Sequence, residues 1–385
     1  MEQALGNIYL SHNNIVSSLG FSTKEVVSKI EKGVSGLNLV DDSSVFSEPF
    51  CASLVDTEKL QKAFSNLQSP ENFTRLEQMM IVSLDKVIKA SNIKLNERVG
   101  LIVSTTKGNI DALDENNSFE AERAYLGKLG AQIKIFFGFQ NEAIVVSNAC
   151  ISGLLAVAIA KRYISSGIYD HVFIAGGDIV SEFTLSGFHS FQALSNAPCK
   201  PYDANRTGIN IGEVVASALV TKEDSNLSED AVVVLGEGSC NDANHISGPS
   251  RTGEGLYRSI QSAMRQAKVS SGEVDYISAH GTATPYNDEM EAIAFNRAGL
   301  QKVPMNSLKS YFGHSLGASG LVETIVGMQS LANNTLYPSL GFETLGVSQP
   351  INVIEEITHT PLNLFLKTAS GFGGCNSAIL FKKAL

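Results

Sequence analysis

Short runs of apolar, often β-branched residues alternate along the chain with longer stretches whose apolar residues recur at helical spacing. The short runs predict strands at residues 99–104, 143–147, 171–175, 214–221, 231–236, 274–279 and 362–368. The longer stretches predict helices that include residues 23–33, 72–91, 151–166, 252–268, 288–298 and 315–333. Strands that alternate with helices in this way predict an α/β fold in which most strands run parallel.

The sequence contains one candidate boundary between two parts and one weak internal repeat. No linker rich in Pro, Gly or Ser divides the chain, and the clearest boundary is the polar seam at residues 222–230 (KEDSNLSED), which lies between two predicted strands. A strand that ends at Ser147 leads into residues 148–153 (NACISG), and a strand end at residues 305–309 leads into residues 313–320 (GHSLGASG). Both segments open helices rich in small residues, which suggests two similar βα halves around a common centre.

Composition narrows the class of protein. Charged residues make up 18% of the 385 positions and the net charge is −10, so a large interior is expected and non-specific nucleic-acid binding is not. The N-terminus lacks the basic region of a signal peptide, and the most apolar stretch, residues 154–160, is far shorter than the roughly 20 residues of a membrane span. The five cysteines form no CxxC pair, so neither disulfides nor a zinc site are indicated. We expect a cytoplasmic globular protein.

Cys150 is the clearest single candidate for chemistry. It follows an apolar strand and comes directly before a helix, so its thiol should face the positive end of that helix. A helix N-terminus favours the thiolate and lowers the pKa of a cysteine. The alternative is a buried structural cysteine, because free cysteine is among the most buried residue types.

Two further segments follow predicted strands. His280 ends the strand at residues 274–279, where α/β proteins place ligands, and Asp288 downstream could organise the loop. Residues 371–376 (GFGGCN) contain Gly371, Phe372 and Gly373, a backbone whose N–H groups could face an oxyanion. Taken alone, a histidine is more often structural than catalytic, and a glycine-rich loop is weak support. No dinucleotide or Walker A pattern occurs.

A third segment that follows a predicted strand end contains a lysine and a second histidine. Lys309 and His314 follow the strand end at residues 305–309, and Glu323 lies on the helix that comes next. A lysine beside a histidine can pair with a carboxylate and hold the histidine neutral. An ordinary helix-capping lysine and a loop histidine are the alternative.

Five blocks in order resemble the signatures of one family. NACISG (148–153), PYDANRTGINIGE (201–213), HGTATPYND (280–288), KSYFGHSLGASGLVE (309–323) and GFGGCN (371–376) are similar to those of the β-ketoacyl-acyl carrier protein synthases, above all the elongating 3-oxoacyl-acyl carrier protein synthase II type. The resemblance runs from the first helix to the end of the chain. It implies the thiolase fold, with two pseudo-symmetric halves in a layered α/β/α/β/α arrangement and the active site between them. Residues 1–225 would carry the nucleophile, and residues 226–385 the histidines, the lysine and a gating loop.

The resemblance also implies residue roles. Cys150 would accept the acyl group, with His280 and His314 as the two active-site histidines and Lys309 as the lysine that orients them. Phe372 would be the gating aromatic, and its backbone N–H would form an oxyanion hole with that of Cys150. The supporting residues would be Glu323, the acidic partner of the lysine, with Asp288, Gly371 and Gly373.

The function implied is a decarboxylative Claisen condensation of the acyl group on Cys150 with malonyl-acyl carrier protein, in fatty acid or polyketide/polyene biosynthesis. Neither a metal nor a cofactor is required, because phosphopantetheine of the carrier protein holds the substrates. The expected partners are acyl carrier protein and a second ketosynthase chain, in a homodimer or a heterodimer. One alternative is a non-catalytic subunit of the chain-length-factor type, although Cys150 and both histidines are retained. The other is a thiolase with Cys375 as base, which the HGTATP block disfavours.

Several positions depart from the family pattern. The opening strand reads IYLSHNN (8–14), the segment between Gly108 and Cys150 is short, Cys375 replaces a common threonine, and Lys107 stands where small or apolar residues line the acyl tunnel. These departures favour a specialised polyketide or polyene pathway. A carrier protein is acidic and should dock on a basic patch. The candidate residues are Lys62, Arg75, Lys128, Lys134, Lys200 and Arg206.

Overall fold

The computed structural model describes residues 6–242 and 248–384, and within them one mixed sheet organises the molecule. Its strands are β1 (Tyr9–Ser17), β4 (Val99–Ser104), β5 (Ile144–Val146), β6 (His171–Asp178), β8 (Val214–Thr221), β9 (Val232–Asn241), β10 (Tyr276–Ser278), β11 (Pro304–Asn306), β13 (Asn352–Val353), β15 (Leu364–Gly371) and β16 (Cys375–Lys383). Their order across the sheet is β13-β11-β10-β15-β16-β9-β1-β8-β6-β4-β5. Two small sheets join β2 (Asn38–Val40), β3 (Phe50–Ser53) and β7 (Ile211–Gly212), and β12 (Thr335–Leu336) with β14 (Thr358–His359).

Helices cover both faces of this sheet. They are α1 (Thr23–Glu31), α2 (Thr57–Ser65), α3 (Arg75–Ser91), α4 (Leu126–Phe137), α5 (Ser152–Ser165), α6 (Glu182–Ser190), α7 (Glu254–Ala267), α8 (Pro285–Arg297), α9 (Lys309–Phe312) and α10 (Ser319–Asn333). Each strand and helix predicted from the sequence is present, β4 and β8 with the predicted ends and the others with shifted ends. The family resemblance alone indicates β1 as the opening strand, and neither the pattern nor the resemblance indicates β16, α2, α4 and α6. None of the helices in the described part of the chain combines the length and the apolar character needed to cross a bilayer.

The expectation of mainly parallel strands is wrong for the middle of the sheet. The outer strands β5, β4 and β6 run parallel, as do β11, β10 and β15. The inner strands β8, β1, β9 and β16 pair only antiparallel. Hairpin-like returns such as the β15–β16 connection need few residues, so they leave no helical segment in the sequence to announce them.

The sheet contains the same pattern twice. From the outer side to the centre of the sheet, the first half reads β5-β4-β6-β8-β1 and the second half reads β11-β10-β15-β16-β9. When the strands of each set are numbered by their order in the chain, both sets read third, second, fourth, fifth, first. The parallel and antiparallel pairs also fall at the same places in both sets. The two sets meet where β1 pairs with β9. The faint repeat in the sequence therefore reflects a duplicated βα arrangement.

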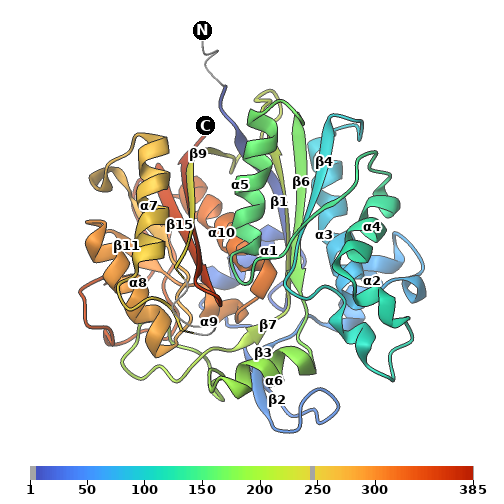
Figure 1. Ribbon diagram of the computed structural model, residues 1–385, viewed down its shortest axis with the longest axis horizontal. Helices are drawn as coiled ribbons and strands as arrows, with labels where there is room; N and C mark the ends of the chain where they lie inside the picture. Colours follow the sequence, from blue (N-terminus) through green and yellow to red (C-terminus); the bar gives the residue numbers. More distant parts are fainter. Residues whose placement is uncertain (1–5, 243–247, 385) are drawn as a thin grey trace.

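Two corresponding helices form the central layer. In Figure 1, α5 and α10 lie between the half of the sheet that contains β4 and β6 and the half that contains β9 and β15, with α3 and α7 on the outer faces. Glycines let α5 and α10 approach closely. A Cβ on Gly320 would lie 2.5 Å from the backbone N of Leu154, and one on Gly153 would lie 2.8 Å from the carbonyl O of Gly317. This confirms the predicted α/β/α/β/α layering.

The opening strand carries a bulge at its polar residues. The register with β8 shifts between Ser11 and Asn13, and His12 has a positive φ of 37°. The polar seam covers this bulge: Asn13 donates to Asp230 at 2.6 Å, and Ser11 bonds Ser228 at 3.0 Å. The unusual IYLSHNN start therefore forms β1 at the centre of the sheet, because partners distant in sequence satisfy its polar side chains.

Candidate active site

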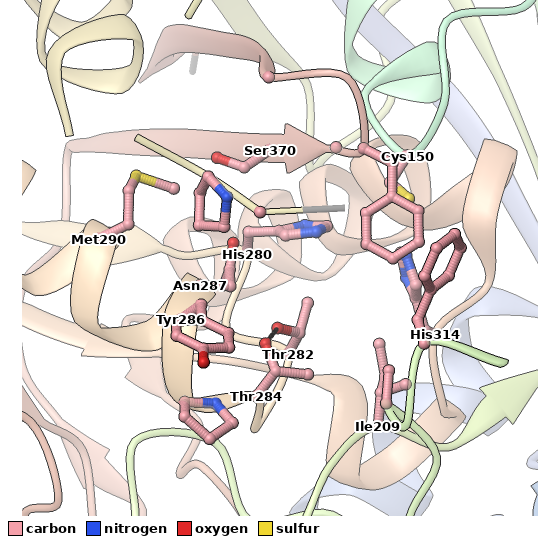
Figure 2. A pocket seen from close by; sticks show the side chains of 18 of the residues that line it. Cys150, Ile209, His280, Thr282, Thr284, Tyr286, Asn287, Met290, His314 and Ser370 are labelled. Carbon is pink, nitrogen blue, oxygen red and sulfur yellow. Dashed lines mark hydrogen bonds between the residues drawn. The ribbon is translucent and has the colours of Figure 1, made fainter. Parts of the chain in front are cut away.

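A cavity of about 500 Å³ lies between the two halves, at the ends of their strands. Cys150 from the first half and His280 and His314 from the second half line it together (Figure 2). Phe372 also lines it, and Thr282 and Thr284 stand along the wall. The structure thus brings together residues that are far apart in sequence.

Cys150 stands on a tight turn between β5 and α5, as its sequence position predicts. The preceding Ala149 takes a positive φ of 44°, and residues 148 and 150 form a bridge across the turn. Ser152 fixes this shape, because its hydroxyl accepts from the N–H of Asn148 at 2.8 Å and donates to the carbonyl of Ala149 at 2.6 Å. The turn holds the Cys150 sulfur at the cavity although the residue is only 6% exposed.

The protonation state of Cys150 differs from the sequence expectation. Burial raises the pKa of the thiol to about 11, more than the charges of Lys107 and Lys309 and the N–H of Phe372 lower it. Asp178 acts in the same direction as burial. The helix N-terminus therefore does not by itself give a thiolate, because desolvation penalises the charged form.

The two histidines face each other as neutral rings. Their centroids lie 5.3 Å apart with the planes 82° to each other, and both side chains are almost fully buried. Burial, followed by the charge of Lys309, holds the pKa of each imidazole well below its usual value. Nδ1 of His314 lies 2.9 Å from the hydroxyl of Ser319, which leaves Nε2 for the cavity. Neutral imidazoles can act as hydrogen-bond donors without adding charge.

A buried ion cluster supports His280 from behind. The ammonium of Lys309 donates to the carbonyl of His280 at 2.7 Å and to Glu323 at 2.7 Å, and it lies 3.4 Å from His280 Nδ1. Since an ammonium only donates, Nδ1 accepts and the ring proton of His280 sits on Nε2. Lys309 and Glu323 thus lie where the sequence prediction requires them.

A second lysine in this cluster was not anticipated. Lys367 on β15 lies 2.5 Å from the other oxygen of Glu323, and it donates to the carbonyls of Ser278 and Ala279 at 3.1 Å each. The sequence did contain a signal, because a lysine inside the apolar run LFLKTA is unusual unless it is paired. Two ammonium groups therefore share one buried carboxylate.

Asp288 lies behind the loop that carries His280. It accepts from the N–H groups of Tyr202 at 2.7 Å and Thr282 at 3.0 Å, and burial raises its pKa to about 7. The neighbouring Glu291 accepts from the N–H groups of His280 and the next residue at 2.9 and 2.7 Å. Both carboxylates hold the loop in shape, which agrees with the organising role expected for Asp288.

The glycine-rich segment is the turn between β15 and β16. Gly373 and Gly374 have φ values of 81° and 78°, which only glycine adopts easily. A Cβ on Gly371 would lie 3.0 Å from the backbone N of Cys150 and 2.8 Å from the sulfur of Cys375. The turn therefore places Phe372 beside Cys150, where its ring packs on Phe188 with centroids 5.4 Å apart.

The basic candidates are dispersed. Arg75, Lys134, Lys200 and Arg206 all face carboxylates, and only Lys62 and Lys128 are exposed with no ion-pair partner among the described residues. The arginine that lines the cavity is a different one, Arg251, which is exposed and has no partner within the described ranges. Nothing in its sequence neighbourhood distinguished it.

Among residues 6–242 and 248–384, no group of three or more His, Cys, Asp or Glu side chains is arranged to hold a metal ion.

Asp178 also belongs to the site, although the sequence analysis missed it. It accepts from Thr105 and from the N–H groups of Thr106, Lys107 and Gly317 at 2.7–3.1 Å, which ties a loop of the first half to the start of α10 in the second.

Known proteins share this architecture over the whole chain. The ishigamide ketosynthase/chain length factor superposes with a TM-score of 0.89 at 25% identity, covering 99% of this chain and all of that one. The fold is therefore the thiolase fold expected from the sequence.

Sequence comparison points the same way. 3-Oxoacyl-[acyl-carrier-protein] synthase 2 of Rhizobium meliloti is 33% identical over 62% of this chain and 60% of its own length. 3-Oxoacyl-[acyl-carrier-protein] synthase 1 of Buchnera aphidicola is 28% identical over 96% of this chain and 97% of its own. The models for the N-terminal and C-terminal domains of beta-ketoacyl synthases match residues 16–226 and 231–343. The chain therefore belongs to the β-ketoacyl synthase family.

Proposed function

We propose that the protein condenses an acyl group held on Cys150 with malonyl-acyl carrier protein, releasing CO2 and giving a 3-oxoacyl-acyl carrier protein. One observation carries this proposal: a buried thiol and two neutral imidazoles line one cavity between the halves. The names of the two relatives, both 3-oxoacyl-[acyl-carrier-protein] synthases, support the same reaction.

In the first half-reaction the acyl group moves to the enzyme. The Cys150 sulfur bonds to the acyl carbon, the carbon–sulfur bond of the carrier thioester breaks, and the thiol proton ends on the departing pantetheine sulfur. The developing oxyanion would be received by the backbone N–H groups of Cys150 and Phe372. The close approach of the Gly371 backbone to Cys150 supports this pairing.

In the second half-reaction malonyl-carrier protein loses CO2. The electron pair of the broken carbon–carbon bond moves onto the thioester oxygen, and the Nε2–H groups of His280 and His314 would stabilise that charge. The enolate carbon then attacks the acyl carbonyl, and Cys150 leaves as a thiolate. Lys309 and Glu323 serve by keeping Nε2 of His280 protonated, which their contacts with Nδ1 and the backbone support.

We assign no metal and no cofactor to this reaction, because each step is a transfer of an acyl group or a proton and the substrates arrive on phosphopantetheine. Residues 1–225 form the half with the nucleophile, and residues 226–385 form the half with Lys309, both histidines and the Phe372 loop. A reducing, cytoplasmic compartment suits the free thiol of Cys150.

A second chain completes the working enzyme, either another copy or a chain-length-factor-like subunit. The similarity to the ishigamide ketosynthase/chain length factor supports the heterodimer. The non-catalytic alternative is disfavoured because this chain itself retains Cys150, His280 and His314. The departures at Lys107 and Cys375 favour a polyketide or polyene pathway over ordinary fatty-acid elongation.

The test is to incubate the protein with malonyl-carrier protein and a panel of saturated, unsaturated and aryl-primed acyl-carrier proteins, and to read adducts by intact mass. Acylation should appear on the native protein and be absent from Cys150→Ala, and 3-oxoacyl-carrier protein should follow. No adduct with any carrier would overturn the condensing function. Equal extension of saturated and unsaturated or aryl acyl groups would overturn the specialised pathway alone.

A further inference from the structure

The proposed chemistry leaves the charge of Cys150 unexplained. The sulfur must be a thiolate when it attacks and again when it leaves, yet burial raises its pKa to about 11. The charged and titratable groups around the sulfur come from several elements. They are Lys107 after β4, Asp178 on β6, His280 after β10, Lys309 on α9, His314 before α10 and Cys375 on β16. Of these, only the two lysines oppose the effect of burial.

The strand register places the loop that carries Lys107 beside the turn that carries Cys150. Ser104 at the end of β4 pairs with Val146 at the end of β5, so the loops that leave the two strands start side by side. They stay together, because the N–H of Thr105 donates to the carbonyl of Val146 at 3.2 Å and the hydroxyl of Ser147 donates to the carbonyl of Thr106 at 3.5 Å. The nucleophile turn and the Lys107 loop are therefore direct neighbours.

The duplication of the fold gives Lys107 a counterpart. β4 and β10 are the second strands of the two halves, and each leads into a residue followed by a glycine with positive φ. In the first half the pair is Lys107 and Gly108, with φ 57°, and in the second half it is His280 and Gly281, with φ 42°. Lys107 lies three residues after β4 and His280 two residues after β10, so the equivalent loops of the two halves carry a lysine and an imidazole near, but not at, the same position.

The side chain of Lys107 is held but not neutralised. Asp178 fixes its backbone by accepting from its N–H at 3.1 Å and from that of Thr106 at 2.9 Å. The ammonium itself is half-buried and donates to the hydroxyl of Thr106 at 3.1 Å. No carboxylate among the described residues forms an ion pair with this ammonium. Asp178 accepts from the same Thr106 hydroxyl at 3.0 Å and offsets part of the Lys107 charge, yet that charge still lowers the pKa of the Cys150 thiol, since partial burial weakens screening by water.

We propose that Lys107 is a positioning residue that stabilises the thiolate of Cys150. The proposal rests on the assignment of Cys150 as the nucleophile. A cation here acts in both half-reactions. It raises the fraction of sulfur able to attack the carrier thioester, and it stabilises the same sulfur when the carbon–sulfur bond of the acyl-enzyme breaks. Lys309 cannot fill this role alone, because Glu323 already shares its charge.

The test follows the reactivity of the thiol without any substrate. The proteins are native, Lys107→Met, Lys107→Arg and the matched control Lys62→Met, which removes an exposed lysine from α2. Each is treated with iodoacetamide between pH 6 and pH 10, and the alkylation rate of Cys150 is followed by peptide mass. We expect Lys107→Met to react at least about threefold more slowly at pH 8, with its rate–pH line displaced to higher pH.

Lys107→Arg should restore the rate to within about twofold of the native protein, and Lys62→Met should match it. Methionine is no larger than lysine, so blocked access cannot explain a slower rate. A Lys107→Met line that superimposes on the native line would overturn the proposal, and so would equal slowing in Lys62→Met. The readout needs no carrier protein, so a failed condensation assay with a displaced alkylation line would reject the enzyme function and keep the role of Lys107.

Discussion

The two halves share a strand pattern but differ in what their equivalent loops carry. After the third strand, the first half places Cys150 on a short turn before α5, and the second half places Lys309 and His314 before α10. After the second strand, the first half has Lys107 and the second half His280. In the proposed reaction, one half thus supplies the sulfur that forms a covalent bond, and the other supplies neutral donors. A duplicated scaffold can separate covalent from electrostatic catalysis because each half evolves its own loops on an unchanged sheet.

Their supports differ as well. The second half stabilises its histidines with a fully buried cluster, Lys309 and Lys367 on either side of Glu323. The first half has Asp178, which is satisfied mainly by backbone N–H groups. Substitutions in the buried cluster of the second half should therefore change the charge balance of that cluster. Substitutions in α5 and α10, the central layer to which both halves contribute, should instead change packing.

The largest effect should come from the donors of the second half. We expect His280→Ala or His314→Ala to lower condensation by about 10²–10³-fold, because each removes one donor to the enolate oxygen. Acylation of Cys150 should fall far less, since it depends on the thiol and the backbone N–H groups. Single-turnover assays of the two half-reactions measure both effects.

The control is His359→Ala, which removes an exposed histidine on β14. Equal losses in both half-reactions for His280→Ala would contradict the division of labour between the halves.

Because both histidines have pKa values well below the usual range, they stay neutral as the pH falls to about 6. Condensation should accordingly show no loss from imidazole protonation between pH 7 and pH 6.

The next effect concerns the buried cluster. Glu323→Gln leaves two ammonium groups buried without a counter-charge, so we expect the free energy of unfolding to fall by about 3–5 kcal/mol. The double variant Glu323→Gln/Lys367→Met removes one cation as well, and it should recover part of that loss. Urea unfolding measures both. A Glu323→Gln protein as stable as the native one would show that the cluster does not hold the second half together.

Particular residues show why prediction from the sequence succeeded in part. Cys150, His280, His314 and Phe372 lie in short loops or turns, and Lys309 begins the short helix α9 after β11. Local patterns mark both the strand and the side chain that follows it. Lys367 and Asp178 were missed because their roles depend on partners from other strands, which no local pattern encodes.

The fold divides in the same way. Strands with apolar runs, such as β4 and β8, were predicted almost to the residue, because burial on both faces leaves a continuous apolar segment. The apolar pattern does not predict β1, which only the family resemblance indicates, since its Ser11, His12 and Asn13 are polar and are satisfied by the distant 226–230 loop. The lowered pKa expected for Cys150 failed for a related reason: burial is a property of the folded molecule.

A smaller effect should come from the layer that the halves share. Gly320→Ala would place a Cβ 2.5 Å from the backbone of Leu154, so α5 and α10 would have to separate, at a cost of about 1–3 kcal/mol. Gly127→Ala in α4 is the matched control, because nothing lies within 4 Å of its new Cβ and alanine favours the helix. Denaturant midpoints compare the two. Equal stability of both variants would mean that the central helices do not require close contact.

The smallest effect should come from the mouth of the cavity, where the carrier protein must approach. Arg251 is exposed, lines the cavity and has no ion-pair partner among the described residues. It belongs to the second half. Carrier proteins are acidic, so Arg251→Glu should raise the KM for malonyl-carrier protein about three- to tenfold and leave kcat nearly unchanged. The difference should shrink as salt is added, because an exposed charge is screened. Lys62→Glu makes the same charge change on α2 of the first half and serves as the control. A larger KM for Lys62→Glu than for Arg251→Glu would place the docking surface on the first half instead.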